Sequence, residues 1–381
     1  MLYAASRMSC TLDGINQVGH YEQDGYLGRD ARVRRNTDNF RLACGNLPSG
    51  AMNSLTDVPG VLVGHCTLRD GDINTGVTAI LPHGGNLFRR KVVAASHVIN
   101  GFGKTVGLVQ IDELGAIETP ILLTNTLSVA ACSAALIRDA LARNPDIGRT
   151  TSTVNAVVGE CNDGPLNDIQ AMAVTEDHAR SALAAAHGGP VEQGSIGAGT
   201  GMTCFGFKGG IGSASKRLEI AGEDFHLGAL VLTNFGNAGD LILPDGRRPS
   251  PPDPEVKTTE KGSVIVVLAT DVPLEHRQLS RVARRGGAGL ARLGSFWGHG
   301  SGDITIAFST ANPVDHDEDR DIVSRRVLNE SRIDLLFRAA AEATQEAVLN
   351  SMLAADRFVG RGGTLRTSLA DWLNGEAGRA S

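Results

Sequence analysis

Residues 244–263 run from an exposed loop into a buried strand, and they end in a serine whose position suits a nucleophile. Residues 244–261 are rich in proline and charged side chains, so they can neither continue a helix nor pair as a central strand. Residues 264–269 are an unbroken apolar run with several β-branched side chains, the pattern of a strand buried on both faces. If the bond between Gly262 and Ser263 were cut, the new α-amine, with a reference pKa of about 7.7–8.0, could take the proton of the hydroxyl on the same residue.

The local pattern leaves alternatives open at two places. The dipeptide Gly-Ser also occurs at 194–195, 212–213, 294–295 and 300–301, so an ordinary turn is the competing interpretation of residues 262–263. Polar residues 160–164 follow a predicted strand at 154–158, where site residues are often carried on a loop. Asn162-Asp163-Gly164 is equally typical of a simple turn.

Two glycine-containing stretches resemble nucleotide-binding loops but lack a required glycine. Gly103-Lys104-Thr105 would need a glycine five positions before Gly103, where Val98 stands. The dense glycine cluster at 194–201 would need a glycine at 202 to complete a dinucleotide motif, and that position is Met202. The cluster therefore predicts a place where the backbone closely approaches a ligand or another backbone segment.

Composition excludes several classes of protein. The chain has 381 residues, enough for two average domains or one large layered α/β unit. A net charge of −6 without a large basic block argues against a nucleic-acid partner. The sequence contains no run of 18 apolar residues, so no membrane-spanning helix is predicted. Residues 1–10 lack the pattern of a secretory signal. We therefore expect a cytoplasmic protein with no membrane partner.

The cysteines indicate neither a metal site nor a redox pair. Their spacing gives no zinc knuckle and no CxxC motif, which favours reduced thiols and no bound metal for Cys10, Cys44, Cys66, Cys132, Cys161 and Cys204.

Strands and helices are predicted in runs rather than in strict alternation. Apolar patterning predicts strands at 61–65, 77–81, 106–110, 120–124, 154–158, 227–233, 264–269 and 304–308, and helices at 128–143, 168–187, 274–293 and 335–353. Residues 205–213 are interpreted as a continuation of the glycine-rich loop. This order favours sheets packed between helical layers over a doubly wound nucleotide fold.

In combination, the motifs of the chain resemble those of the self-cleaving L-aminopeptidase/D-amidase-esterases and β-aminopeptidases. The resemblance covers about residues 45 to 365 and is carried by residues 53–60, 63–65, 75–80, 118–121, 124–127, 162–164, 166–168, 194–212, 234–236, 262–263 and 300–303. It implies an α/β (α+β) fold, a four-layer αββα sandwich that forms a single domain from two chains after self-cleavage. Residues 1–44 would be a flexible N-terminal extension, residues 45–262 the α-chain part and residues 263–381 the β-chain part.

The resemblance also implies partners and chemistry. Members are homo-oligomers, here expected as a tetramer of αβ units, and they need no metal or cofactor. They remove N-terminal residues from short peptides, amides and esters. Ser263 would attack first the carbonyl of Gly262 and then the substrate, with its own α-amine as general base, and Asn234 would donate a hydrogen bond to the oxyanion.

Further site residues are implied in the same way. Ser301 and Asp303 would orient the hydroxyl and stabilise the ammonium of the new terminus. Glu160 would pair with the N-terminal ammonium of the substrate, because an unpaired buried charge is costly. Pro165 departs from the family, whose members commonly carry a tyrosine after Asn-Asp-Gly, so a phenol that could hydrogen-bond in the site is missing.

Two other functions remain open from the sequence. One is acyl transfer, as in the related ornithine acetyltransferases, although these use threonine where this chain has Ser263. The other is an uncleaved, non-catalytic binding protein of the same fold, for which Pro165 is the sequence support.

Overall fold

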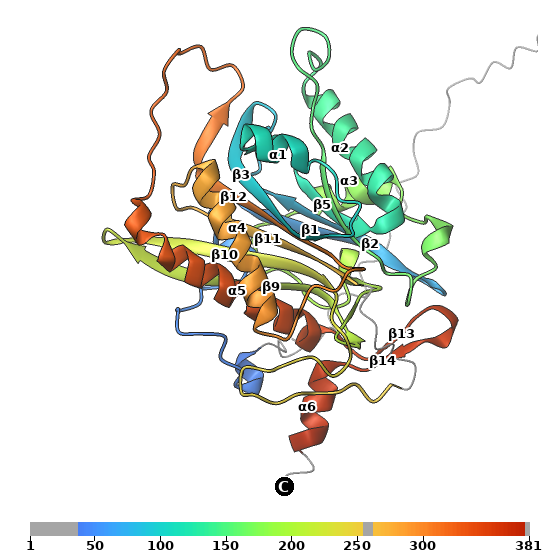
Figure 1. Ribbon diagram of the computed structural model, residues 1–381. Coiled ribbons are helices and arrows are strands. Elements are labelled where there is room, and N and C mark those ends of the chain that lie inside the picture. Colours follow the sequence, from blue (N-terminus) through green and yellow to red (C-terminus); the bar gives the residue numbers. More distant parts are fainter. Residues whose placement is uncertain (1–36, 254–261, 378–381) are drawn as a thin grey trace, which may run out of the picture. The chain divides into compact units, whose positions relative to one another are not determined.

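Two β-sheets are stacked face to face in the structure, a computed structural model that describes residues 37–253 and 262–377 (Figure 1). The first sheet has four strands in the order β1 (Leu62–Asp70), β2 (Ile73–Leu81), β5 (Ile121–Asn125) and β6 (Val157–Cys161). The second has six, in the order β4 (Ala116–Ile117), β3 (Arg90–Gly101), β12 (Gly302–Asp315), β11 (Ser263–Thr270), β10 (Glu223–Asn234) and β9 (Gly210–Ile220). Two short hairpins join β7 (Thr203–Cys204) to β8 (Phe207–Lys208) and β13 (Phe358–Val359) to β14 (Leu365–Arg366).

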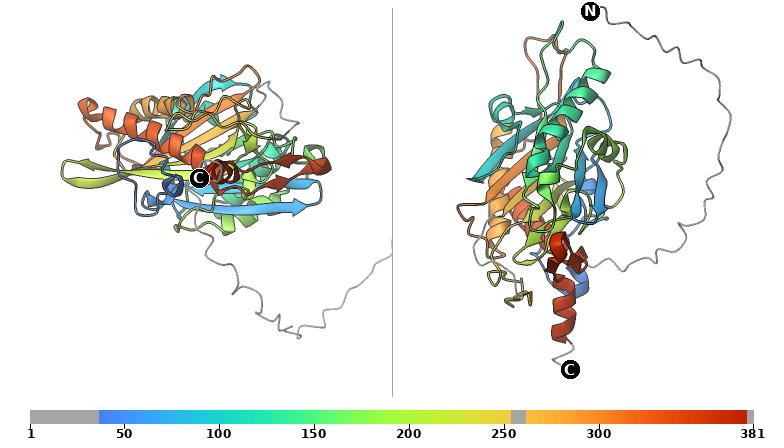
Figure 2. Two further views of the ribbon diagram at one scale, coloured as in Figure 1. Left: turned by 90° about the horizontal axis from the view of Figure 1, so that it is seen from below. Right: turned by 90° about the vertical axis from the view of Figure 1, so that its right-hand side faces the viewer.

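Helices cover the outer face of each sheet. Helices α2 (Val129–Arg143) and α3 (Glu176–Ala184) pack on the first sheet, and α4 (His276–Ala291) and α5 (Asp334–Ala354) pack on the second (Figure 2). Helix α1 (Leu108–Leu114) lies beside β3, and α6 (Leu369–Ala377) packs against α5. The expected four-layer αββα sandwich is thus confirmed, with one apolar core between the sheets and one between each sheet and its helices.

Strand β11 lies inside the second sheet and is buried along its whole length. It pairs antiparallel with β10 and parallel with β12. Its side chains alternate between Val264, Val266 and Leu268, which face the helices, and Ile265, Val267 and Ala269, which face the other sheet. The predicted strand buried on both faces is confirmed.

Three element predictions were wrong. Residues 106–110 are not a strand: helix α1 occupies Leu108–Leu114, bounded by Gly107 and Gly115, both at positive φ, and its apolar Val109 is exposed. Residues 210–213 open strand β9 instead of continuing a loop. The helix expected at 168–187 is confined to Glu176–Ala184, because the chain before it makes a turn of 3-10 helix.

The first described residues pack into the domain, which corrects part of the expected extension at 1–44. The backbone N–H of Thr37 donates to the side chain of Asn350 on α5 at 3.1 Å. Leu42 and Cys44 are buried in the core beneath the helices. Residues 37–44 therefore belong to the layered unit, while residues 1–36 of the predicted extension and residues 254–261 of the predicted loop lie outside the described residues.

None of the helices in the described ranges is both long enough and apolar enough to cross a lipid bilayer.

The close approach of β9 to α5 gives a prediction about stability. A Cβ at Gly212 would overlap the carbonyl oxygen of Ala347 on α5. We expect Gly212→Ala to lower the free energy of unfolding by about 1–3 kcal/mol, the usual range for overpacking a core. Gly375→Ala, at an exposed position of α6 where an added Cβ meets no atom within 4 Å, is the control and should be neutral or stabilising by up to about 1 kcal/mol. Equal changes for the two variants in urea unfolding would contradict this packing.

Candidate active site at the start of the central strand

Ser263 is the first residue of β11, 5% exposed, and its Oγ accepts a hydrogen bond from the backbone N–H of Gly302 at 3.1 Å. Continuing the alternation of the strand, its side chain lies on the face of Ile265, toward the first sheet. Gly262 precedes it, and a Cβ at that position would overlap the carbonyl oxygen of Asn234. Glycine is therefore the residue that this backbone approach accepts.

Asn234 ends β10 directly opposite Ser263 in the antiparallel register. Its Oδ1 accepts the backbone N–H of Thr203 at 3.1 Å. Its Nδ2 donates to the carbonyl of Asn162 at 2.9 Å. An amide nitrogen carries two N–H donors, and the contact with Asn162 uses one of them. The side chain is thus held at both ends next to the serine.

Ser301 and Asp303 lie on the turn into β12, the other neighbour of β11. The parallel register aligns Ser263 with Gly302 and Val264 with Asp303. Ser301 Oγ donates to Asp303 Oδ1 at 2.7 Å, and both side chains are fully buried. A buried carboxylate therefore lies one residue from the serine in the strand ladder.

Glu160 lies near the end of β6 in the other sheet, and it is 2% exposed. Its Oε1 accepts the backbone N–H of Lys104 at 2.7 Å, and its Oε2 accepts the hydroxyl of Thr126. A Cβ at Gly103 would lie 3.5 Å from Glu160 Oε1 and 3.6 Å from the Cα of Gly302. One glycine thus separates this carboxylate from the backbone that contacts Ser263 Oγ.

The structure therefore brings together every site residue predicted from the sequence. The second sheet contributes the hydroxyl, the amide and one carboxylate, from Ser263, Asn234 and Asp303, and the first sheet contributes Glu160. A hydroxyl beside an amide donor suits acyl transfer, since the donor can stabilise a tetrahedral oxyanion. A buried carboxylate nearby suits a cationic group on the substrate.

Burial decides the protonation of two groups beside Glu160. It raises the pKa of the Cys161 thiol well above its usual range, and the charge of Glu160 adds to that effect, so Cys161 stays a thiol and not a nucleophilic thiolate. Burial also raises the pKa of Asp163 to about 6. Asp163 Oδ1 accepts a hydrogen bond from the side-chain amide of Asn167 at 2.9 Å, which stabilises the turn after β6.

Sequence reasoning missed the groups that orient the site. Thr203 and Lys104 act through backbone N–H groups and Asn162 through its carbonyl, contacts that no side-chain motif reveals. Thr126 could have been noticed, because its hydroxyl lies inside the matched motif at 124–127. Pro165 is exposed on the turn after Asp163.

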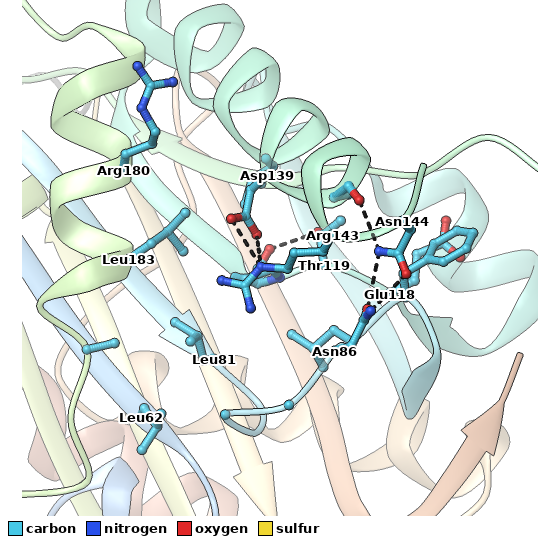
Figure 3. Close-up of a pocket in the computed structure, with 18 of the residues that line it drawn as sticks. Leu62, Leu81, Asn86, Glu118, Thr119, Asp139, Arg143, Asn144, Arg180 and Leu183 are labelled. Atoms are coloured by element: carbon cyan, nitrogen blue, oxygen red, sulfur yellow. Dashed lines mark hydrogen bonds and ion pairs between the residues drawn. The ribbon is translucent and has the colours of Figure 1, made fainter. Parts of the chain in front are cut away.

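A separate pocket of about 400 Å³ lies between α2, α3 and the edge of the first sheet (Figure 3). Its floor is apolar, with Leu62, Leu81 and Leu183, and an Arg143–Asp139 ion pair borders it. None of the candidate active-site residues lines it. Across the described ranges, no group of three or more His, Cys, Asp and Glu side chains is arranged to hold a metal ion.

Comparisons with known proteins point to one family. The model of peptidase family S58 matches residues 53–366. The β-peptidyl aminopeptidase BapA of Sphingosinicella microcystinivorans is 38% identical over 340 residues, which cover 82% of this chain and 84% of that protein.

Solved structures agree with this result. A β-aminopeptidase from Burkholderia sp. is 38% identical with a TM-score of 0.81, over 91% of this chain and 98% of that one. The L-aminopeptidase D-Ala-esterase/amidase of Ochrobactrum anthropi is 34% identical with a TM-score of 0.81, over 91% of this chain and all (100%) of that one. The latter is described as a prototype for the serine aminopeptidases and a variant of the Ntn hydrolase fold.

The raised pKa of Asp163 predicts a pH-dependent stability. The folded chain holds this proton up to about pH 6, against a usual value of 3.8, so stability is lost as the pH rises from 3.8 to about 6 and is regained as the pH falls through the same range. A shift of about two units corresponds to about 3 kcal/mol. Asp163→Asn keeps the acceptor for Asn167 and cannot ionise. Between pH 7.5 and 4.5, wild type should gain stability relative to this variant in urea unfolding, and a constant difference would contradict the raised pKa.

Proposed function

We propose that this chain, which belongs to peptidase family S58, is a self-processing N-terminal-serine aminopeptidase, amidase and esterase acting on short peptides, amino-acid amides or esters. The observation that carries the proposal is the row formed by Asn234, Ser263 and Gly302 across three paired strands. This row places the hydroxyl of Ser263 beside the amide of Asn234 and the N–H of Gly302, directly after the Gly262–Ser263 bond.

Self-cleavage would begin with attack of Ser263 Oγ on the carbonyl carbon of Gly262. The C–N bond breaks, the hydroxyl proton passes to the departing nitrogen, and an ester links the two residues. Water then hydrolyses the ester to give the carboxylate of Gly262 and the hydroxyl of Ser263, whose α-amine was freed when the C–N bond broke. The second N–H of the Asn234 amide would stabilise the oxyanion, a contribution usually worth about 2.7–4 kcal/mol.

Substrate hydrolysis would use the same groups in a second round. The α-amine of Ser263 takes the hydroxyl proton as Oγ attacks the substrate carbonyl, and it returns the proton to the leaving amine or alcohol. Asp303, held by the hydroxyl of Ser301 at 2.7 Å, would stabilise the ammonium form of the new terminus. Water completes the cycle by hydrolysing the acyl-enzyme.

Glu160 would select substrates with a free N-terminus. Its carboxylate is buried and bound by one backbone N–H and one hydroxyl, both neutral donors. An ammonium group brought next to it would form a charge-assisted hydrogen bond in a site sheltered from water. This accounts for an aminopeptidase activity, in line with the names of the relatives.

Self-cleavage can be tested on a gel together with hydrolysis. Purified wild type should run as two fragments, residues 1–262 and 263–381, and hydrolyse p-nitroanilides of L-, D- or β-amino acids. Ser263→Ala should stay in one piece and lose at least about a hundredfold in rate, because it lacks the attacking oxygen.

The matched control is Ser295→Ala, which alters another Gly-Ser dipeptide whose buried hydroxyl has no partner among the described residues. It should be cleaved and active. Cleavage of Ser263→Ala, or acetyl transfer to amino acids much faster than hydrolysis, would contradict the proposed function.

Glu160→Gln tests substrate selection. Glutamine keeps an acceptor for the N–H of Lys104 but removes the charge. We expect KM for substrates with a free amine to rise about tenfold or more, since a charge-assisted hydrogen bond is worth about 1.5–3 kcal/mol. Glu118→Gln, a buried carboxylate that accepts the N–H of Asn155 at 2.7 Å outside the site, should leave KM unchanged. An unchanged KM in Glu160→Gln would refute this role.

A further inference from the structure

A fully buried lysine lies beneath the glycine-rich loop that borders the candidate active site. Lys208 is 0% exposed, at the end of β8. Its ammonium donates to the carbonyls of Gly199 at 3.0 Å, Met202 at 2.9 Å and Gly209 at 2.7 Å. An ammonium has three donors, so these carbonyls satisfy all of them. In the described part of the chain no carboxylate forms an ion pair with it.

Burying an ammonium without a carboxylate partner is costly, which indicates that Lys208 has a role beyond filling space. Burial lowers the pKa of Lys208 well below its usual range, while the negative charge of Asp163 acts in the opposite direction. The ring of Phe358 lies 5.0 Å from Nζ and offers a further contact for the charged form. An apolar residue of similar length would fill this space without the cost of burying a charge.

The three carbonyls flank the β7–β8 hairpin on both sides. Met202 stands directly before the hairpin and Gly209 directly after it, and the N–H of Gly209 also donates to the carbonyl of Met202 at 3.0 Å. The ammonium therefore closes the base of the hairpin. Phe205 and Phe207 of the hairpin are fully buried in the core and also hold it, while the glycines at 199, 201, 209 and 210 leave the backbone around the ammonium without side chains.

The hairpin in turn holds the side chain of Asn234. Thr203, the first hairpin residue, follows Met202 directly and is the partner of Lys208 in the hairpin register. Its N–H donates to Asn234 Oδ1 at 3.1 Å, which fixes which way the amide faces. The opposite end of the amide donates to the carbonyl of Asn162. A shift of Thr203 would remove the donor to Oδ1 and allow the amide to rotate.

We propose that Lys208 is a positioning residue for the reaction: by tying the carbonyls of Gly199, Met202 and Gly209, its ammonium fixes the Thr203 N–H that orients the Asn234 amide toward the oxyanion. This inference rests on the proposed function, because it assigns to Asn234 the stabilisation of the oxyanion.

A double-mutant cycle separates positioning from a general structural role. Lys208→Met should lower kcat at least about tenfold, a part of the roughly 10²- to 10³-fold loss typical of a missing oxyanion donor, with KM changed less than about threefold. In an Asn234→Ala background the same substitution should change kcat less than about threefold, because the side chain that it acts on is gone. Where a variant is not cut during expression, its rate of self-cleavage after purification serves as the second readout.

The control is Lys216→Met, which also removes a buried ammonium, one that pairs with Glu346 at 2.7 Å. Its effect on kcat should be equal in both backgrounds. Lys208→Arg, which keeps the charge but carries a planar group with different donor geometry, should fold and show an intermediate loss of kcat.

Equal losses from Lys208→Met in both backgrounds, or failure of both Lys208 variants to fold, would overturn the inference and leave Lys208 a role in stability alone. An inactive wild type, or an Asn234→Ala variant with normal kcat, would instead refute the proposed function. These results differ from equal losses of kcat in both backgrounds, which would refute only the role of Lys208.

Discussion

The backbone pairing of Asn234 with Ser263 is the contact on which the site depends. Strand β11 is held between β10 and β12, so residues at its first position are aligned with the last residue of β10 and the first of β12. The ladder fixes the hydroxyl, the amide and the N–H of Gly302 without any flexible loop between them. Gly262 continues the same close approach, since any side chain there would overlap the Asn234 carbonyl. A rigid strand end is the kind of support that precise chemistry needs.

Buried polar groups surround this row instead of a purely apolar core. Lys208 lies under the glycine-rich loop and Asp163 under the turn after β6. Each of these groups is costly to bury, so hydrogen bonds to defined partners are needed to offset the cost. Such bonds are directional, and they restrict the loops around the site to one arrangement more strictly than apolar packing does.

Periodicity in the sequence was enough to predict the fold class and some of its strands, but not all of the elements around the site. The apolar run after Ser263 predicted β11 from periodicity alone, because both faces of that strand are covered. Strand β9 escaped the same reasoning, since it begins Gly-Ile-Gly-Ser-Ala-Ser. Small residues are needed there, because α5 and the loop at Gly194 approach the backbone too closely for larger ones, so no hydrophobic alternation marks its start. Helix α1 was missed for the opposite reason: its apolar residues resemble a strand but one of them is exposed.

The site residues came from motif resemblance, and the structure added what motifs do not contain. Thr203, Asn162 and Lys104 contribute backbone atoms, whose positions follow from tertiary packing and not from side-chain type. Even Lys208 acts only through carbonyls. Spacing along the chain does not reveal the first three contacts, because Thr203, Asn162 and Lys104 lie 31, 72 and 56 residues from the side chains that they bond.

Covalent labelling tests most directly whether one residue is both chain terminus and nucleophile. Purified protein treated with a small sulfonyl fluoride should lose activity in step with the formation of one adduct, located by mass spectrometry on the hydroxyl of Ser263 at the first position of the fragment 263–381. An adduct on another serine that abolishes activity, or inactivation of a chain that is still in one piece, would contradict an N-terminal nucleophile.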